Sequence, residues 1–386
     1  MPSFKTWMFK SFLLMAMTGD AGAQVIWTTR NAGTPSILES VVWTGNQLVT
    51  VGAAGSILTS PDGISWSAKV SGVTNNLFFV AWTGTQIVAV GSGIILTSPN
   101  GISWTARNYG LTSTLNSVVW AGSQLVAVGE SGTIITSPDG ISWTARNSGV
   151  TNRLASVGWT GSQLIVAGDG GKILTSPDGI SWTARNSGTT AALASVTSTG
   201  AQLVVVGNGG VILTSTDGVI WMMRSSGTTS NLTASIWTGG QVVSVGVSGA
   251  ILSSPDQMNW TTRTSGTTNR LGSVTWTGSQ LVVVGQGGIV LTSPQEPVGV
   301  ISQYLQNHLA LRIVSSKLLI SLPGSLQSHP VRAVVYALTG NKLLEMPVQL
   351  SATSIDMPLS NLGQGSYLFE LRSLNKRIVE VFSLPR

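Results

Sequence analysis

The sequence contains no cysteine, and charged residues make up only 9% of its 386 residues. Without cysteine the chain can form neither a disulfide nor a thiolate zinc site, so its stability must come from packing alone. The low charge and a mean hydropathy of +0.31 exclude a charge-rich disordered chain. The two histidines, His308 and His329, stand apart from any cluster of acidic residues. We therefore predict neither a metal site nor a cofactor.

The chain is rich in glycine, with 46 residues, and one short segment is repeated along most of its length. Residues 176–182 read Ser-Pro-Asp-Gly-Ile-Ser-Trp, and near-copies begin at Ser60, Ser98, Ser137, Ser215 and Ser254. The closing tryptophans, with one more upstream, recur about every 39 residues: Trp27, Trp66, Trp104, Trp143, Trp182, Trp221 and Trp260. A repeat of this length with glycine-rich turns indicates the blades of a propeller rather than a helical solenoid.

Residues 154–185 show how one repeat is built. Four short runs rich in Val, Ile, Leu, Trp and Thr, at 154–159, 163–167, 172–176 and 180–185, alternate with turns containing Gly, Pro and Asp. This order predicts an antiparallel meander of four strands, which is one blade. The first strands of the repeats end at Trp43, Trp82, Trp120, Trp159, Ser198, Trp237 and Trp276. The sequence therefore predicts an all-β chain with a seven-bladed propeller over residues 24–294.

The two ends of this region are incomplete in complementary ways. A fourth strand, Val25 to Arg30, precedes every first strand, and the last repeat loses its pattern at Pro294 after three strands. We expect residues 25–30 to supply the fourth strand of the seventh blade. Closing the ring in this way removes the open sheet edge that would otherwise pair with another chain.

The net charge of +6 invites a nucleic-acid interpretation, but the basic residues are too widely spread to support it. One basic residue follows each repeated tryptophan at a fixed distance: Arg30, Lys69, Arg107, Arg146, Arg185, Arg224 and Arg263. A charge that occurs once per blade is distributed around a ring, whereas a nucleic-acid site needs a concentrated basic surface. We predict solvated outer strands and no nucleic-acid partner.

The segments outside the repeats predict export. Residues 1–23 combine Lys5 and Lys10 with a short apolar run and an Ala-Gly-Ala cleavage site before Gln24, which is typical of a signal peptide. The apolar run is too short to span a bilayer, so we expect no transmembrane segment in the mature chain. Residues 295–304 read as a linker, and the apolar and alternating runs of residues 305–386 predict a small C-terminal β-sandwich.

The repeated segment has a structural explanation that needs no ligand. Proline fixes φ, aspartate accepts hydrogen bonds from nearby backbone N–H groups, glycine adopts the positive φ that follows, and tryptophan packs in the sheet. The aspartates are Asp62, Asp139, Asp178, Asp217 and Asp256. The segment resembles the Asp-box of the BNR repeat family, Ser-x-Asp-x-Gly-x-Thr-Trp, with glycine one residue early. That resemblance implies that the repeated segments lie on the rim of the propeller opposite the face that usually binds ligands.

Two further resemblances concern function and location. With its Trp-Thr-Ala-Arg-Asn-Ser-Gly stretches, the repeat unit is similar to the propeller of the photosystem II stability and assembly factor family, which implies a non-enzymatic binding propeller. Residues 335–340, residues 362–367 and the final strand resemble the C-terminal sorting domain of type IX secretion. That resemblance implies secretion machinery as a partner and a protein that is secreted or displayed on the outer membrane of a Gram-negative bacterium.

The candidate ligand-binding face lies opposite the repeated aspartates, where the loops differ from blade to blade. Its polar residues are Asn76, Glu130, Arg153, Asp169, Asn208, Asn231, Arg270 and Gln286. Such side chains on a rigid scaffold suit a protein or glycan partner. We predict a binding protein and assign no catalytic residue.

Two other functions remain open on the sequence. A glycoside hydrolase could use Glu130 and Asp169 as its pair of carboxylates, since they occupy equivalent loops of adjacent blades. A sialidase-like site would need three central arginines, and only Arg153 and Arg270 stand outside the repeated position in the propeller. A purely structural surface protein would bind no ligand at all.

Overall fold

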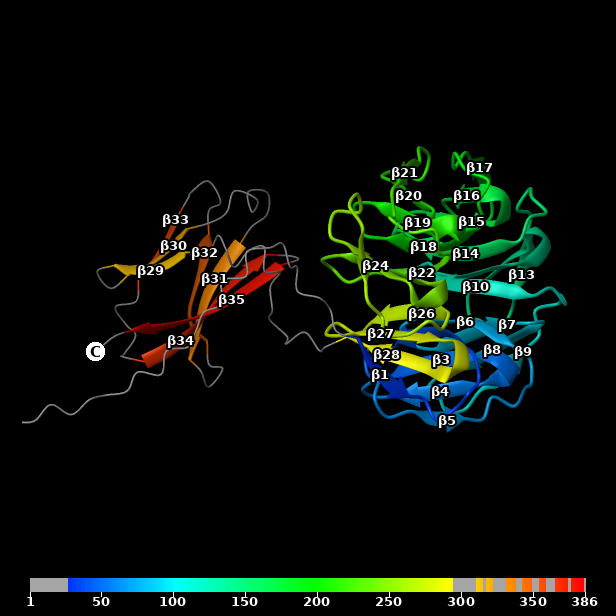
Figure 1. Ribbon diagram of the computed structural model, residues 1–386, viewed down its shortest axis with the longest axis horizontal. Helices are drawn as coiled ribbons and strands as arrows, with labels where there is room; N and C mark the ends of the chain where they lie inside the picture. The colour runs from blue at the N-terminus through cyan, green and yellow to red at the C-terminus, as the bar shows by residue number, and fades with distance from the viewer. Residues whose placement is uncertain are drawn as a thin grey trace, which may run out of the picture.

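The structure, a computed structural model, describes residues 27–293 and, after them, seven strands between residues 310 and 384. Residues 27–293 form seven four-stranded sheets, which follow one another in chain order (Figure 1). The first strand of each sheet contacts the first strands of the sheets before and after it, and the last of these, β26, contacts β2. The sheets are therefore blades around one axis, and the fold is the all-β seven-bladed propeller that the repeats predict.

The strands of each blade have nearly constant lengths. The first strands are β2 (Leu38–Trp43), β6 (Leu77–Trp82), β10 (Leu115–Trp120), β14 (Leu154–Trp159), β18 (Leu193–Ser198), β22 (Leu232–Trp237) and β26 (Leu271–Trp276). The second strands are β3 (Leu48–Gly52), β7 (Ile87–Gly91), β11 (Leu125–Gly129), β15 (Leu164–Gly168), β19 (Leu203–Gly207), β23 (Val242–Gly246) and β27 (Leu281–Gly285).

The outer half of each blade follows the same pattern. The third strands are β4 (Ile57–Ser60), β8 (Ile94–Ser98), β12 (Ile134–Ser137), β16 (Lys172–Ser176), β20 (Ile212–Ser215), β24 (Ile251–Ser254) and β28 (Ile289–Thr292). The fourth are β5 (Ser67–Lys69), β9 (Thr105–Arg107), β13 (Thr144–Arg146), β17 (Thr183–Arg185), β21 (Met222–Arg224), β25 (Thr261–Arg263) and β1 (Thr28–Asn31). Six blades carry a short 3-10 turn after the second strand: η1 (Ala53–Gly55), η2 (Glu130–Gly132), η3 (Asp169–Gly171), η4 (Asn208–Gly210), η5 (Val247–Gly249) and η6 (Gln286–Gly288).

Strand β1 closes the ring. It pairs antiparallel with β28, with Thr28 opposite Thr292 and Asn31 opposite Ile289. Arg30 adds a bond from its Nε to the Thr292 hydroxyl, 3.0 Å away. The N-terminal residues thus supply the fourth strand of the seventh blade, as predicted, although the strand spans residues 28–31 rather than 25–30.

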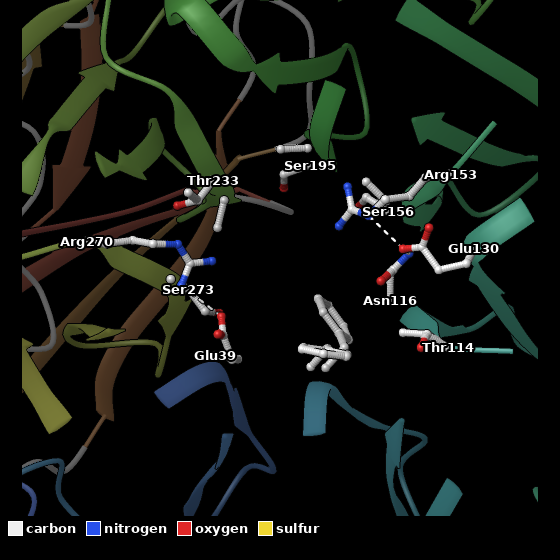
Figure 2. A pocket seen from close by; sticks show the side chains of 16 residues that line it. Glu39, Thr114, Asn116, Glu130, Arg153, Ser156, Ser195, Thr233, Arg270 and Ser273 are labelled. Atoms are coloured by element: carbon white, nitrogen blue, oxygen red, sulfur yellow. Dashed lines mark hydrogen bonds and ion pairs between the residues drawn. The ribbon is translucent and has the colours of Figure 1, made fainter. Parts of the chain in front are cut away.

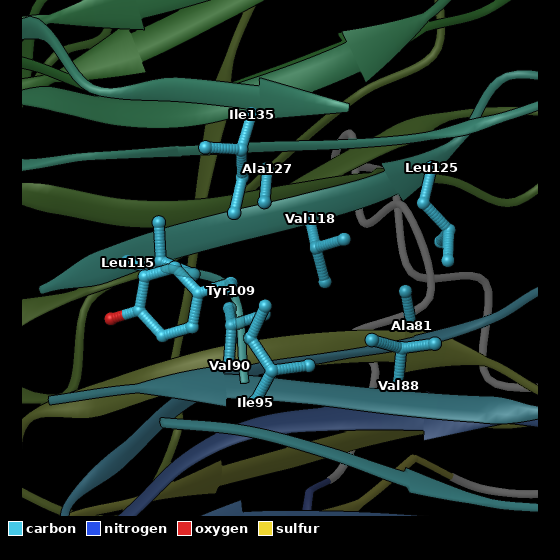
Figure 3. Close-up of a cluster of buried hydrophobic side chains, with 10 residues drawn as sticks. All are labelled: Ala81, Val88, Val90, Ile95, Tyr109, Leu115, Val118, Leu125, Ala127 and Ile135. Carbon is cyan, nitrogen blue, oxygen red and sulfur yellow. The ribbon is translucent and has the colours of Figure 1, made fainter. Parts of the chain in front are cut away.

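The hydrophobic core lies between the blades. One cluster joins Val88, Val90 and Ile95 of the second blade to Leu115 and Leu125 of the third, and every one of these side chains is fully buried (Figure 3). The second strands are buried at all five positions, which explains why they read as continuous apolar runs rather than as alternating ones. Each buried Val, Leu or Ile contributes roughly 1.5 to 3 kcal/mol, so inter-blade packing dominates the stability of the ring.

The turn between the third and fourth strands, here called the aspartate turn, is closed by its own side chains. In the fourth blade the Asp178 carboxylate accepts the backbone N–H groups of Ile180 and Ser181, both at 2.9 Å. The Ser176 hydroxyl accepts the N–H of Gly179 at 2.8 Å, and the Trp182 indole donates to the Gly179 carbonyl at 3.2 Å. The backbone N–H groups at Ser181 and Ile180 hold the pKa of Asp178 below its usual value. In the second blade Asn100 replaces the aspartate and accepts the equivalent two N–H groups.

A glutamine joins each of five aspartate turns to the neighbouring blade. Gln124 of the third blade donates from Nε2 to the Asp178 carbonyl of the fourth at 2.7 Å. The equivalent donors are Gln47, Gln86, Gln163 and Gln280, which bond to the carbonyls of Asn100, Asp139, Asp217 and Asp62. The contact needs glycine in the turn, because a Cβ at Gly179 would lie 3.1 Å from Nε2 of Gln124.

The sixth blade departs from this arrangement. Gln257 stands where the other turns have glycine, and its φ is +60°. Within the described residues, the Gln202 Oε1 and the Trp260 Nε1 are both buried without a hydrogen-bond partner. The side chain of Gln257 occupies a position that glycine leaves open in the other turns, and this turn lacks the bond from tryptophan Nε1 that the others have.

After residue 293 the described strands form two antiparallel sheets. One has the order β29 (Ala310–Val314), β30 (Lys317–Ser321), β33 (Ser354–Pro358), and the other β32 (Lys342–Val348), β31 (Val331–Ala337), β34 (Gly365–Ser373), β35 (Lys376–Leu384). Strand β33 was not expected from the sequence. That the two sheets form a sandwich stays a prediction, and residues 1–23, residues 295–304 and both histidines lie outside the described residues.

Among the described residues, no helix has the length and apolar character needed to cross a lipid bilayer. In the same part of the chain, no three His, Cys, Asp or Glu side chains gather where they could hold a metal ion.

We expect Gln257→Gly to stabilise the propeller. The change removes a side chain from a left-handed backbone position and lets Trp260 and Gln202 regain their bonds, which together should raise the free energy of unfolding by about 1 to 2 kcal/mol. Urea unfolding followed by tryptophan fluorescence measures the gain. Gln257→Ala is the control, because it keeps a Cβ at this position. Equal stability of the glycine and alanine variants would contradict the explanation.

Acid should weaken the propeller through the aspartate turns. Backbone N–H groups, that of Asn259 foremost, lower the pKa of Asp256 from 3.8 to about 2, and the other four aspartates shift in the same direction. A lowered folded-state pKa stabilises the protein above the ordinary value, and this stability is lost as the pH falls through the lowered value. We therefore expect the melting temperature to fall between about pH 4 and pH 2.

A variant with all five aspartates changed to asparagine tests this origin. Asparagine accepts the same N–H groups in the turn of Asn100, so the variant should fold at neutral pH and lose less stability on acidification. Circular dichroism melts across this pH range make the comparison. An acid-induced loss as large as that of the unaltered chain would show that other groups cause it.

Candidate functional site

The loops opposite the aspartate turns form one continuous face. In each blade the residue after the second strand donates its backbone N–H to the loop that leads into the first strand. In the third blade Glu130 bonds to the Thr114 carbonyl at 3.0 Å, and in the fourth Asp169 bonds to that of Arg153 at 2.9 Å. The same bond occurs at Ala53, Ser92, Asn208, Val247 and Gln286. Both sets of variable loops therefore meet at one end of the ring.

A cavity of about 390 Å³ opens at this end of the propeller axis. All seven first strands contribute to its wall, so it lies at the centre of the ring. We call it the central cavity and define it by one residue from each blade: Glu39, Phe78, Asn116, Ala155, Ala194, Thr233 and Gly272. Figure 2 shows polar side chains reaching it from opposite sides.

The charged residues that break the repeat gather around this cavity. Outside the repeated basic and aspartate positions, residues 27–293 contain six charged side chains: Glu39, Glu130, Arg153, Asp169, Lys172 and Arg270. Four of them, Glu39, Glu130, Arg153 and Arg270, line the cavity, and Asp169 pairs with Arg153 at its edge. Scattered substitutions of a repeat would not be expected to converge in this way.

On one side of the cavity an arginine links two adjacent blades. The Arg153 Nε lies 3.0 Å from the Glu130 Oε1, and its Nη1 lies 3.6 Å from the Asp169 Oδ1. Asn116 donates from Nδ2 both to the same Glu130 oxygen, at 3.2 Å, and to the Leu154 carbonyl, at 2.9 Å. The charged side chains are about two-fifths exposed, so the ion pairs add little stability, roughly 0 to 1 kcal/mol. Their main effect is to fix where the charges lie.

A second ion pair faces the first across the cavity (Figure 2). Arg270, in the loop before β26, places its Nη1 2.8 Å from the Glu39 Oε2 on β2. Since β26 belongs to the seventh blade and β2 to the first, this pair spans the junction where the ring closes. The Glu39 side chain is only 20% exposed, which makes it the most buried of these charged groups.

Below the charged rim, serine hydroxyls tie neighbouring first strands together. The Ser117 Oγ accepts the Val157 N–H at 3.3 Å, and the Ser156 Oγ accepts the Val196 N–H at 3.2 Å. Ser40, Ser195 and Ser273 make the same bond to the next blade. Only two blades lack the serine, which is replaced by Phe79 in the second and by Ala234 in the sixth. Phe79 and its neighbour Phe78 both line the central cavity.

The structure brings together half of the residues that the sequence singled out for binding. Glu130, Arg153, Asp169 and Arg270 meet at the central cavity. The other four residues, Asn76, Asn208, Asn231 and Gln286, do not line it. Asn76 and Asn231 are occupied in holding turns, because their Oδ1 atoms accept the N–H groups of Ala54 at 2.9 Å and Gly209 at 2.8 Å. Asn208 and Gln286 are exposed at the turns η4 and η6.

Among the cavity residues that sequence reasoning missed are Glu39, Phe78 and Asn116. All three occupy the second position of a first strand, and the other blades have Ala, Thr or Gly there. Comparing this one position across the seven repeats would have identified all three.

Comparisons with known proteins bear on the fold. No protein-family profile matches the chain, and no curated protein matches it in sequence. Among solved structures, YCF48 from Cyanidioschyzon merolae aligns with a TM-score of 0.58 and 18% identity, over 69% of this chain and 98% of that one. A structure of YCF48 bound to D1 peptide aligns equally well, with 19% identity over 69% of this chain and 96% of the other.

Other solved structures align to the same degree. The WD40 propeller domain of Doa1 gives a TM-score of 0.58 with 14% identity, over 70% of this chain and 98% of its own. A catalytically inactive virginiamycin B lyase from Staphylococcus aureus, with quinupristin, gives 0.58 with 9% identity, over 70% and 99%. At identities this low, a structural match shows the fold alone, so function must be argued from the residues of the site. The chain is thus a seven-bladed propeller whose fold is similar to that of YCF48.

Proposed function

We propose that this protein is an exported, non-enzymatic propeller that binds a segment of a partner protein at its central cavity. The observation that carries the proposal is the convergence of Glu39, Glu130, Arg153, Asp169 and Arg270 on one cavity of a ring that otherwise repeats. A rigid scaffold with variable polar loops at one end suits recognition.

The structural neighbours support a peptide ligand over a sugar. YCF48 has been solved with D1 peptide, and its propeller aligns over almost its whole length. The cavity offers both hydrogen-bonding charged groups and aromatic surface, as a recognition site for a peptide requires. Residues 27–293 contain no histidine, and Glu130 and Asp169 both face the Arg153 guanidinium. No observation at this site favours the glycoside hydrolase.

Peptide display tests the proposal. The chain without residues 1–23 is panned against a random peptide library, and affinities of selected peptides are measured by fluorescence anisotropy. We expect saturable binding whose affinity changes at least about tenfold, in either direction, in the double variant Arg153→Ala, Arg270→Ala, because the loss of these two guanidinium groups alters the charge of the cavity wall. The double variant Arg146→Ala, Arg185→Ala is a matched control, since it removes the same charge from outer strands.

Three outcomes would contradict the proposal. Peptides that bind both double variants equally would place the ligand elsewhere on the propeller. Failure to select any peptide, with saturable binding on a glycan array, would make the protein a carbohydrate-binding one. Release of reducing sugar that disappears in Glu130→Gln would make it a hydrolase.

Export is the other half of the proposal, and it rests on residues 1–23 and on the C-terminal segment. We expect a full-length chain expressed in a Gram-negative host to lose its first 23 residues and begin at Gln24. Mass spectrometry of the cell-envelope and medium fractions measures the mature mass. A variant ending at residue 304 should be processed in the same way and fail to reach the surface. A full-length chain that keeps Met1 in the cytoplasm would refute export.

A further inference from the structure

The wall of the central cavity has one aromatic sector. Phe78 and Phe79 come from β6 in the second blade, and both side chains are partly exposed. Phe79 occupies a position where five blades carry a serine that accepts the next blade's N–H. A phenylalanine cannot accept this bond, so the ring loses one inter-blade hydrogen bond at this point. The substitution therefore places an apolar surface in the cavity at the expense of a structural contact.

Carboxylates flank this aromatic sector. The second blade lies between the first, which carries Glu39, and the third, which carries Glu130. The five charges around the cavity comprise three acids and two arginines, so the site has an excess of negative charge. Each guanidinium is already bonded to a carboxylate, whereas the Glu39 Oε1 and the Glu130 Oε2 make no hydrogen bond within the described part of the chain. These two oxygens are free to accept bonds from a cationic ligand.

The opposite sector has small side chains. Ala155 of the fourth blade, Ala194 of the fifth and Gly272 of the seventh line the wall there. Small residues leave room for a peptide backbone to pass across the cavity while its side chains face the second blade. Negative charge on both sides of an apolar surface is complementary to the reverse pattern in a ligand.

We propose that the cavity takes an extended peptide segment in which an aromatic or aliphatic residue is flanked by basic residues. The apolar side chain packs on Phe78 and Phe79, and the basic side chains lie against Glu39 and Glu130. This inference rests on the proposed function and narrows it, because it states the class of peptide.

Three labelled synthetic peptides test the proposal directly: Ala-Lys-Phe-Lys-Ala, Ala-Lys-Ser-Lys-Ala and Ala-Glu-Phe-Glu-Ala, each capped at both ends. Binding to the chain without residues 1–23 is measured by fluorescence anisotropy. We expect the first peptide to bind at least about tenfold more tightly than the other two, and its affinity to fall as salt is added. Equal affinity for the first and third peptides, or tighter binding of the third, would overturn the inference.

Phe79→Ser is the decisive variant. It restores the repeat's own residue and with it the acceptor for the Val118 N–H, which offsets part of the packing lost with a ring that lies against the inter-blade core, so the variant should still fold. It should nevertheless bind the Lys-Phe-Lys peptide at least about tenfold more weakly. Ala234→Ser is the matched control, because it restores the other missing serine without removing an aromatic ring and should leave affinity unchanged. Unchanged affinity in Phe79→Ser would overturn the inference.

Glu39→Gln and Glu130→Gln provide a second line of evidence if Phe79→Ser folds poorly. Each variant keeps an oxygen that can accept a bond from its arginine but removes the negative charge. Each should therefore weaken the binding of the Lys-Phe-Lys peptide and reduce the difference between its affinity and that of the Glu-Phe-Glu peptide. Selection of acidic peptides that lose affinity in the Arg153, Arg270 double variant would refute this inference and leave the proposed function standing. Failure to select any peptide would refute both.

Discussion

The closed ring, and with it the central cavity, depends on the pairing of β1 with β28. Four residues from the start of the described chain complete a sheet whose other strands lie more than two hundred residues later. Without this pairing β28 would be an open edge, and the first and seventh blades would be joined only by side-chain packing, by the bonds from Ser273 and Gln280 and by the Arg270–Glu39 ion pair. The closed ring brings seven first strands around one axis. The central cavity, with a wall from every blade, exists only because the ring is closed.

Because the blades repeat so closely, a residue that differs from its equivalents in the other blades is informative about function or stability. Five aspartate turns are joined to neighbouring blades by glutamine, and five first strands are joined by serine. One departure, Gln257, occurs beside two buried polar groups without partners and brings only an exposed hydrogen bond from its own Nε2 to the Pro255 carbonyl, so it is a local defect. Phe79 also gives up an inter-blade bond, yet it lines the cavity between two carboxylates. A lost hydrogen bond is therefore only a defect in the aspartate turn at Gln257, whereas at Phe79 it accompanies a new apolar surface in the central cavity.

The sequence predicted the blades, their number and the closing strand because each depends on spacing and on local turn chemistry. It predicted which loops share a face, because strand direction alone decides this. It could not distinguish Asn76 and Asn231 from ligand-binding residues, since their bonds to the turns of neighbouring loops appear only once the backbone is placed. Glu39 and Arg270 are 231 positions apart in the chain, and only the closed ring brings them within 2.8 Å.

The energetics of the cavity favour recognition over structure as the role of its charges. The fully buried apolar clusters between blades supply far more stability than the cavity's ion pairs, which as partly exposed pairs contribute roughly 0 to 1 kcal/mol each. A ring held by packing can therefore vary these charges at little cost to its fold. The arginines and acids nevertheless occur together, and each guanidinium is bonded to a carboxylate. Such a site presents fixed acceptors beside an aromatic surface, and a cationic, partly apolar segment is the ligand that satisfies both.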